Sequence, residues 1–410
     1  MIRGINAVRR ILPSVLALSM LASLIAAHAS GFKLLYSFTA GADGCYPAGG
    51  VTLGGAGNLY GTTAGGAAPC NQGAAFKLAP DGTLTPLYLF SGGAGGSGPG
   101  GLVMDQKGNL WGSTCCGGVG GGVIFKINAK DHESVAHTFQ GSPNDGCSGG
   151  ATMVVDASGN LYGTTFGCGK FGYGAVYKVK PDGSESLLYS FRGGHNGYNP
   201  FAGVTLDTQG NLYGVTDYGG RLRLCTNGAG GCGTIFKLTP NGTKTLLYAF
   251  KGPLKDGYIP AANPIMDAFG NLYGTTAGGG IGDNCEYGGC GIVFKLTPDG
   301  SETVLHFFKG GRSDGSVSIA GMIEDGAGNL YGTTEFGGGT ISCNMGFGCG
   351  TVFKIAPDGT LTLLHKFKGP TDGANPGPSA GLVADAAGNL YGTAQHGGAN
   401  GYGTVFEITP

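Results

Sequence analysis

The chain has 410 residues, of which 88 are glycine and only 12% are charged, and its formal net charge is −1. So little charge argues against nucleic-acid binding, which needs a basic surface. The 41% share of hydrophobic residues and the many aromatic residues argue against a disordered chain. The glycines recur at fixed places, which predicts that they serve in turns.

The first 29 residues are predicted to be a signal peptide. Three arginines precede an apolar stretch over residues 11–27, and Ala27-His28-Ala29 supplies an A-x-A cleavage site. The alternative is an anchor that stays in the membrane, although no cysteine for lipid attachment follows the apolar stretch. Cleavage would leave 21 Lys and Arg residues against 25 Asp and Glu residues, a net charge of −4. We therefore expect a secreted or periplasmic protein that does not contact the membrane.

The rest of the chain is an internal repeat. A seven-residue motif, GNLYGTT in its commonest form, recurs at spacings of 51 to 60 residues. It begins at Gly57, Gly108, Gly159, Gly210, Gly270, Gly328 and Gly388. Periods of this length are typical of propellers and other repeat architectures.

Each repeat is predicted to contain four short strands, which we name a to d in chain order. In the last repeat, strands a, b and c cover residues 379–384, 389–393 and 403–408, and strand d of the preceding repeat covers residues 361–367. Alternating apolar residues and many β-branched or aromatic residues support these strands. The sequence therefore predicts an all-β, seven-bladed β-propeller with four antiparallel strands per blade, as one domain over residues 30–410.

The two ends of the repeat region complement each other. Residues 31–38, GFKLLYSF, match strand d of later repeats, such as SLLYSF at 186–191. The last repeat ends after strand c, where another strand d would follow. The N-terminal strand is therefore predicted to complete the last blade and close the ring, so that no radial strand edge stays open.

An aspartate recurs four residues before the motif asparagine in six repeats, and the first repeat has Gly54 there. The six are Asp105, Asp156, Asp207, Asp267, Asp325 and Asp385. Calcium ligands or catalytic acids are the alternative interpretation. The Asp and Gly spacing favours a type I turn that ends in a left-handed glycine.

Two aromatic positions also recur, and we expect both to pack between neighbouring blades. In strand b the residues are Tyr60, Trp111, Tyr162, Tyr213, Tyr273, Tyr331 and Tyr391, and in strand c they are Phe76, Phe125, Tyr177, Phe236, Phe294, Phe353 and Phe406. The glycine that follows the strand b aromatic predicts a close backbone approach between strands.

The repeated GNLYGTT, the GTIFKL-like strand c and the Pro-Asp-Gly turn resemble the GloVer-repeat proteins, tandem-repeat exported bacterial proteins with variable anchoring. The resemblance covers residues 31–410. It implies the repeat fold and export, and it implies no settled activity and no functional residues. Members often carry C-terminal sorting signals, whereas this chain ends at strand c. This difference predicts a protein that is freely secreted or resides in the periplasm without a C-terminal anchor.

All twelve cysteines fall in the d–a and b–c loops, on one face of the predicted ring, which we name the loop face. We expect disulfides for Cys45–Cys70, Cys147–Cys168, Cys225–Cys232, Cys285–Cys290 and Cys343–Cys349. Cys115 and Cys116 remain, either as a vicinal bridge or as a mixed pair. A metal site is the alternative, but no histidine accompanies them at metal-ligand spacing.

Variable loops on a rigid repeat scaffold are the usual place for binding. The b–c loop of the fourth blade is the longest and most polar, and it supplies the predicted binding residues Asp217, Tyr218, Arg221 and Arg223, with Asn227 beyond them. Ordinary connecting loops are the alternative. The seven histidines show no metal spacing, and no HExxH, GxSxG or P-loop motif is present, so we predict no cofactor and no metal.

The predicted function is a non-catalytic binding or surface-interaction module, a monomer whose partner is an extracellular carbohydrate or protein. The alternative is a hydrolase or lyase that acts on extracellular glycans at the channel mouth, which would need two suitably placed carboxylates. Candidate acids are Asp43, Asp145, Asp256, Asp314 and Asp372, with Asn196 at the same place in another blade. Their recurrence favours turn roles.

Overall fold

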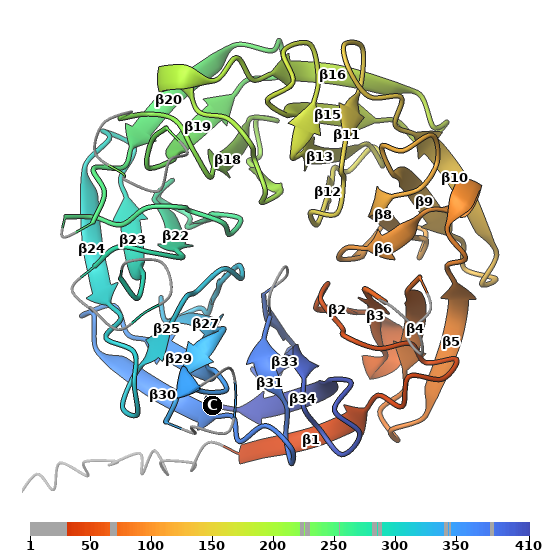
Figure 1. The fold of residues 1–410 in the computed structure, drawn as a ribbon, viewed down its shortest axis with the longest axis vertical. Coiled ribbons are helices and arrows are strands. Elements are labelled where there is room, and N and C mark those ends of the chain that lie inside the picture. The colour runs from red at the N-terminus through yellow and green to blue at the C-terminus, as the bar shows by residue number, and fades with distance from the viewer. Residues whose placement is uncertain are drawn as a thin grey trace, which may run out of the picture.

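The computed structural model describes residues 31–410 except 66–71, 222–224, 226–229, 254, 281–284, 286–288, 340–342, 344–345 and 378–380. Within these residues, seven small antiparallel sheets stand in a ring around a central channel (Figure 1). The predicted seven-bladed propeller is confirmed. The predicted signal peptide lies outside the described residues.

The strands of each blade follow in the order a, b, c, d from the channel outward, and the bounds of the first four blades are as follows. Blade 1 has β2 (Val51–Leu53), β3 (Leu59–Thr63), β4 (Ala74–Leu78) and β5 (Leu84–Leu89). Blade 2 has β7 (Val103–Met104), β8 (Leu110–Cys116), β9 (Val123–Ile127) and β10 (Glu133–Thr138), with β6 (Ser97–Pro99) beside β8. Blade 3 has β12 (Val154–Val155), β13 (Leu161–Thr165), β15 (Ala175–Val179) and β16 (Glu185–Ser190), and blade 4 has β17 (Val204–Leu206), β18 (Leu212–Thr216), β19 (Thr234–Leu238) and β20 (Lys244–Ala249).

The remaining blades repeat this order. Blade 5 has β21 (Ile265–Met266), β22 (Leu272–Thr276), β23 (Ile292–Leu296) and β24 (Glu302–Phe307), and blade 6 has β26 (Ile323–Glu324), β27 (Leu330–Thr334), β29 (Thr351–Ile355) and β30 (Leu361–Lys366). Blade 7 has β32 (Val383–Ala384), β33 (Leu390–His396), β34 (Thr404–Thr409) and β1 (Gly31–Ser37), with β31 (Ala374–Pro376) beside β33. The loops add two small ladders, β11 (Gly146–Cys147) with β14 (Gly167–Cys168) and β25 (Gly315–Ser316) with β28 (Phe336–Gly337), and the 3-10 turns η1 (Gly55–Gly57), η2 (Gly93–Gly95) and η3 (Gly194–Asn196).

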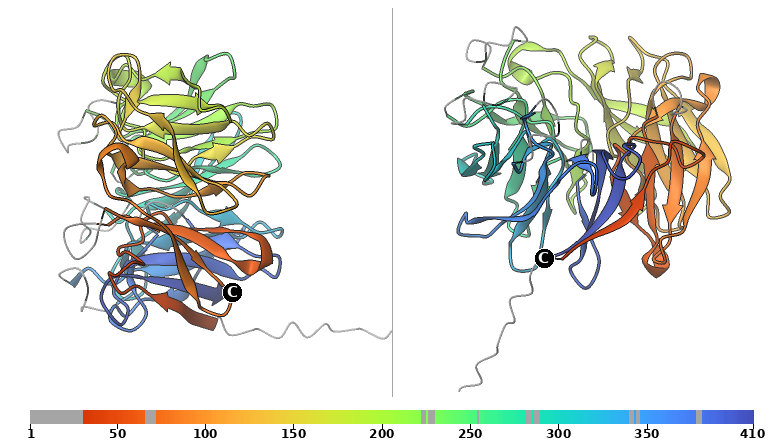
Figure 2. Two further views of the ribbon diagram at one scale, coloured as in Figure 1. Left: turned by 90° about the vertical axis from the view of Figure 1, so that its right-hand side faces the viewer. Right: turned by 60° about the horizontal axis from the view of Figure 1, so that its bottom comes forward.

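The ring closes as the sequence predicts. Strand β1 pairs antiparallel with β34, from Gly31 opposite Thr409 to Ser37 opposite Thr404. The ladder continues into the loop, where the Phe38 N–H donates to the Gly403 carbonyl at 3.0 Å. Seen from the side, the ring is a thick disc (Figure 2).

The core consists of aromatic pairs that join neighbouring blades. The phenylalanine that follows strand d meets the strand c aromatic of the next blade edge to face, with centroids 4.9 to 5.3 Å apart. The seven pairs are Phe38–Phe76, Phe90–Phe125, Phe139–Tyr177, Phe191–Phe236, Phe250–Phe294, Phe308–Phe353 and Phe367–Phe406. Because these rings are almost fully buried and their geometry is favourable, each pair contributes hydrophobic and ring–ring stabilisation to a seam.

The motif glycine makes room for a ring. In blade 4, Gly214 pairs with Phe236 across the sheet, and a Cβ on Gly214 would lie 2.6 Å from Phe236 Cζ. The same strand c aromatic faces the motif glycine in the other six blades, for example Phe353 at Gly332. The expected close approach is therefore made by an aromatic ring, whereas the sequence had suggested a neighbouring backbone.

The recurring aspartates have the predicted turn role. Asp207 Oδ1 accepts the N–H groups of Gln209 and Asn211, both within 2.9 Å, and Oδ2 accepts the Asn211 amide and the Tyr213 hydroxyl. The same pattern recurs at the other five aspartates. Blade 1 has Gly54 in place of this aspartate and so cannot form the same network. There the Tyr60 ring lies so close to Gly54 that a Cβ on Gly54 would clash with it.

Candidate binding site on the loop face

On the loop face, every d–a loop has a left-handed backbone at one equivalent position. These residues are Tyr46, Gly98, Ser148, Asn199, Ile259, Val317 and Asn375, with φ between 53° and 60°. In each of them the N–H donates to a carbonyl in the b–c loop of the preceding blade; Asn199, for example, donates to Tyr173 at 2.9 Å. In the six residues that are not glycine, this backbone costs about 1–3 kcal/mol each. The hydrogen bond recurs at every seam, so it ties neighbouring blades together.

Inside these ties, an apolar hollow of about 430 Å³ opens at the loop-face mouth of the channel. Glycine and alanine backbone from blades 1 to 5 forms much of its wall, together with Cys115. Two exposed rings, Phe166 from blade 3 and Phe201 from the loop into blade 4, meet edge to face over it, with centroids 6.1 Å apart. The hollow therefore offers apolar surface and two aromatic faces to a ligand.

A row of tyrosines lies in the loops at the same seam, between blades 3 and 4. The rings of Tyr173 and Tyr198 have centroids 5.5 Å apart, and those of Tyr198 and Tyr218 have the same separation. We name Phe166, Phe201 and these three tyrosines the aromatic sector. Among the described residues, six phenylalanine, tyrosine or tryptophan side chains are well exposed, and four of them, Phe166, Phe171, Tyr173 and Phe201, lie in the loops of blades 3 and 4.

The predicted binding residues differ in how far they are buried. Tyr218 is half-buried and joins the tyrosine row, and Arg221 is exposed. Asp217 is buried, at 7% exposure, so it does not offer its carboxylate to a ligand directly. Arg223 and Asn227 lie outside the described residues. The binding role of the four predicted residues stays a prediction.

Asp217 has an unusual environment for an acid. The Phe201 N–H donates to its carboxylate, and the Oδ1 atom has no hydrogen-bond partner. Burial raises the pKa of Asp217 to about 8. A largely neutral carboxyl group therefore lies against the backbone that positions Phe201.

Sequence reasoning missed Phe166, Phe201, Tyr173 and Tyr198. The available signal was a break in the repeat: Phe166 follows strand b, where other blades have Ala64, Ala277 or Gln395, and Phe201 corresponds to Ala48 and Ala261. No other blade has an aromatic residue at either position, so the two phenylalanines distinguish this part of the repeat. Their convergence depends on the seam between two blades, which the sequence does not display.

The predicted disulfides form wherever both partners are described, except that Cys115 and Cys116 are not bridged. Disulfides join Cys147–Cys168, Cys225–Cys232, Cys285–Cys290 and Cys343–Cys349. Cys45 is also disulfide-bonded, and its expected partner Cys70 lies outside the described residues. Cys115 and Cys116 are free thiols with sulfur atoms 2.6 Å apart, and burial together with Cys116 raises the pKa of Cys115 to about 12.

The five candidate catalytic aspartates occupy turns, as their recurrence predicted. Each accepts a hydrogen bond from an aromatic side chain of the preceding strand d and from backbone N–H groups at the start of its own loop. The aromatic partners of Asp43, Asp145, Asp256, Asp314 and Asp372 are Tyr36, His137, Tyr248, His306 and His365.

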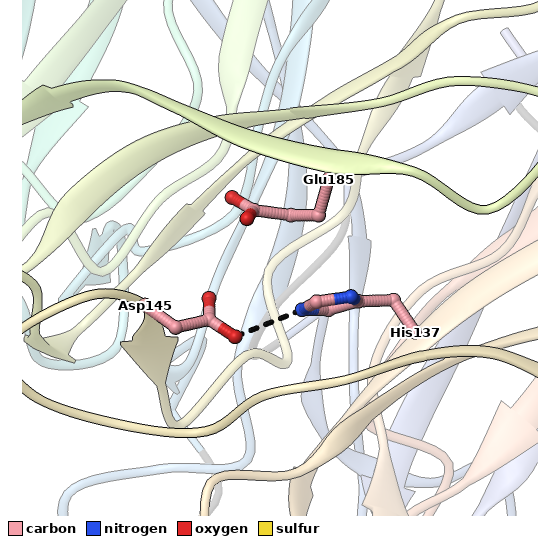
Figure 3. Close-up of side chains that lie close together, drawn as sticks. All are labelled: His137, Asp145 and Glu185. Carbon is pink, nitrogen blue, oxygen red and sulfur yellow. Dashed lines mark hydrogen bonds and ion pairs between the residues drawn. The ribbon is translucent and has the colours of Figure 1, made fainter.

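One of these turns gains a second acid. His137 Nε2 lies 2.9 Å from Asp145 Oδ2, and Glu185 approaches both from β16 of the next blade (Figure 3). One ligand atom from each of the three lies within 4.8 Å of the others. Burial, with a smaller contribution from the Asp145 charge, raises the pKa of Glu185 to about 7.

The fold and the loop-face hollow define a β-propeller with a concave, aromatic-lined mouth. The chain belongs to the Gloeobacter/Verrucomicrobia repeat family, whose model matches residues 24–226, 120–287 and 283–410. The resemblance expected from the motifs is thereby confirmed. None of the curated proteins compared with the chain matches it.

Solved structures share the fold at low sequence identity. A virginiamycin B lyase from Staphylococcus aureus is 14% identical, with a TM-score of 0.57 over 93% of this chain and 99% of that chain. The extracellular domain of a putative one-component system from B. thetaiotaomicron is 12% identical, with a TM-score of 0.57 over 92% of this chain and 40% of that chain. At these identities the likeness shows the fold alone. No helix among the described residues is long and apolar enough to cross a membrane.

Proposed function

We propose that the chain is an exported, non-catalytic binding module that holds a carbohydrate against the aromatic sector of its loop face. The observation that carries this proposal is the hollow of about 430 Å³ beneath the exposed rings of Phe166 and Phe201. Ligand sites are concave, mostly apolar and equipped with few polar groups, and this hollow has that character. Sugar rings present an apolar C–H face that suits a flat aromatic surface.

The tyrosine row supports a carbohydrate ligand. Tyrosine combines an apolar ring with a hydroxyl that can donate or accept hydrogen bonds. Tyr173 is 43% exposed beside Tyr198 and Tyr218, so the row can contact both the faces and the hydroxyl groups of a chain of sugars. The low charge of the protein is also compatible with a neutral ligand.

Two further observations support the binding interpretation and export. The candidate catalytic aspartates are engaged in turns in separate blades, so they favour binding over glycan hydrolysis or cleavage by a lyase. Four disulfides favour an oxidising compartment, secreted or periplasmic.

The test is a glycan array probed with the purified, oxidised protein, followed by calorimetry on the best ligand. Phe166→Ala and Phe201→Ala are expected to weaken binding by about tenfold or more each, the usual loss for an aromatic anchor. Phe269→Ala is the matched control, since Phe269 is 84% exposed in an a–b turn on the opposite face. Equal losses in all three variants, or unchanged binding in the first two, would contradict the proposed site. Capture of a protein ligand alone would contradict the carbohydrate.

A further inference from the structure

The outer rim of the ring repeats one arrangement with informative differences. At five seams, an aspartate of the d–a loop forms a hydrogen bond with an aromatic side chain of the preceding strand d. This aromatic residue stands two positions before the core phenylalanine. The partner is histidine in three blades and tyrosine in two. The start of the next strand d supplies one equivalent residue to each of these seams, and this residue varies: it is Glu185, Glu302 and Leu361 at three seams, and Phe32, which stacks on His365, at the last.

Glutamate occupies that variable position beside two of the pairs. Glu185 lies beside His137–Asp145, and Glu302 lies beside Tyr248–Asp256, where it accepts the Tyr248 hydroxyl at 3.3 Å. Each of these seams therefore brings two carboxyl groups together in a partly buried place. Two such groups repel each other unless a proton or a cation compensates them.

The two seams differ in how the charge can be compensated. At the Glu302 seam, Lys251 Nζ lies 3.8 Å from Asp256 Oδ2. The equivalent residue at the Glu185 seam is Gln140, which offers Asp145 only its backbone N–H. Among the described residues, no lysine or arginine forms an ion pair with Asp145 or Glu185. The Glu185 seam therefore has a glutamine where the Glu302 seam has a lysine, and a histidine where that seam has a tyrosine.

The geometry of the Glu185 seam suits a cation. Asp145 is 6% exposed and His137 18% exposed in their side chains, and Glu185 Oε1 is buried without a hydrogen-bond partner. Figure 3 shows the imidazole and the two carboxylates converging from three separate segments. Their ligand atoms lie within 4.8 Å of one another, and His137 Nε2 and Asp145 Oδ2 are 2.9 Å apart. A tetrahedral ion with bonds of about 2.1 Å would hold its ligand atoms about 3.4 Å apart, so Glu185 would move closer while the other two separate slightly.

We propose that His137 Nε2, Asp145 and Glu185 bind a divalent transition-metal ion of the Zn²⁺ class, with water as the fourth ligand. One imidazole and two carboxylates suit such an ion, whereas Ca²⁺ would need more oxygen ligands. The Nε2 proton leaves on binding, so the imidazole and Asp145 ligate the ion in place of their hydrogen bond. The ion joins β10 of blade 2 to β16 of blade 3 and acts as a clip across the seam. The sequence predicted no metal, because these ligands have no recognisable spacing.

The test uses the full chain with Cys115 and Cys116 alkylated, since free thiols also bind Zn²⁺. Calorimetry with ZnCl₂ is expected to show one ion per chain, and CoCl₂ to give a visible d–d spectrum. Glu185→Gln and His137→Tyr should weaken binding about tenfold or more and abolish the cobalt spectrum. His137→Tyr copies the residue of the Tyr248 seam, so it keeps a hydrogen bond to Asp145 and the fold.

Two variants are matched controls. Glu302→Gln changes the other acid pair, and His306→Tyr changes a histidine–aspartate pair that has Leu361 in place of the second acid. Both should bind Zn²⁺ like the wild type. Absence of Zn²⁺ binding in the alkylated protein, undiminished binding in Glu185→Gln, or equal loss in the controls would overturn the site. A melting temperature that Zn²⁺ raises in the wild type and not in Glu185→Gln would support the clip independently.

Discussion

Directly after strand b, the fourth and sixth blades carry an acid, Asp217 and Glu335, where three other blades carry alanine or phenylalanine. Asp217 is buried at this position with one unpartnered oxygen, and the Phe201 N–H is its stabilising contact. Six other aspartates of the chain lie in turns that satisfy both carboxylate oxygens, for example Asp207. The same residue type therefore has opposite pKa behaviour in two environments of one blade.

Asp217→Asn is expected to stabilise the protein at alkaline pH. The pKa of Asp217 is about 8 in the folded state and near 3.8 in the unfolded state, so its stabilising contribution is complete below about pH 4 and is lost as pH rises to about 8. The asparagine side chain of the variant is neutral at every pH, so the variant does not suffer this loss of stability. At pH 8.5 the variant should be more stable by about 2 kcal/mol, the usual cost of a buried unpartnered polar group. Urea unfolding between pH 4 and 8.5 measures the difference.

Asp207→Asn supplies the control of opposite sign. Although burial opposes the effect, hydrogen bonds from Asn211, Gln209 and Tyr213 hold the pKa of Asp207 below its usual range. Its stabilising contribution is present at neutral pH and is lost in acid, so this variant should be less stable than the wild type at pH 8.5. Parallel pH profiles for the two variants would contradict the assigned environments.

At the scale of the strand, the sheet depends on the contact between the motif glycine of strand b and the aromatic ring of strand c. A side chain on Gly332 would lie 2.6 Å from Phe353 Cζ and 3.1 Å from Met322, all in the core of blade 6. Phe353 cannot move away easily, because Phe308 of the preceding blade packs against it. The glycine thus protects a contact between two blades as well as one within a sheet.

Gly332→Ala is therefore expected to destabilise the ring by about 1–3 kcal/mol, the usual cost of overpacking a core. Gly326→Ala, in the a–b turn of the same blade, is the control, since a Cβ there has nothing within 4 Å. It should be close to neutral. Chemical unfolding of both variants measures the difference, and equal stabilities would show that the core yields without cost.

Strands b, c and d could be predicted from the sequence nearly to their ends, because each alternates with a clear period. Strand a could not. The sequence predicted residues 379–384; residues 379–380 lie outside the described residues, and of the rest only β32 (Val383–Ala384) is a strand. Near the axis the inner strands converge so closely that a Cβ on Gly381 would meet the Gly321 carbonyl of the neighbouring blade. Regular pairing therefore breaks up where blades crowd.

The same physical reason limits prediction of the sites. Residues within one loop, such as the disulfide pair Cys225–Cys232, are close in the sequence and could be paired from it. The Phe166–Phe201 contact and the His137–Glu185 approach each join two blades, so they depend on how the seam is packed. The loop face could be predicted from the position of the cysteines, but the place of the aromatic sector on that face could not.

At the scale of the whole molecule, the seventh seam differs from the others because its outer strand comes from the other end of the chain. Residues 31–38 supply the ladder of β1 with β34, the Tyr36 hydroxyl bond to Asp43 and the fully buried Phe38. Phe38 packs on Phe76 of blade 1, so this one segment contributes to blade 7 and to the seam beyond it. Its loss would expose both the edge of β34 and an aromatic core.

Removing residues 31–38 is expected to lower the melting temperature by about 10 °C or more and to promote aggregation. A buried phenylalanine alone contributes about 3–5 kcal/mol, and the exposed edge strand would pair with other chains. Calorimetry and light scattering measure the two effects. A chain that lacks only residues 1–30 keeps β1 and should melt like the full chain.

A peptide with the sequence GFKLLYSF distinguishes loss of closure from general damage. Added to the truncated protein, it can pair with the free edge of β34 and place its last phenylalanine against Phe76. It should therefore raise the melting temperature and suppress aggregation, whereas a peptide with that phenylalanine replaced by alanine should do so much less. A truncated protein that melts like the full chain would show that the other six seams hold the ring without the seventh.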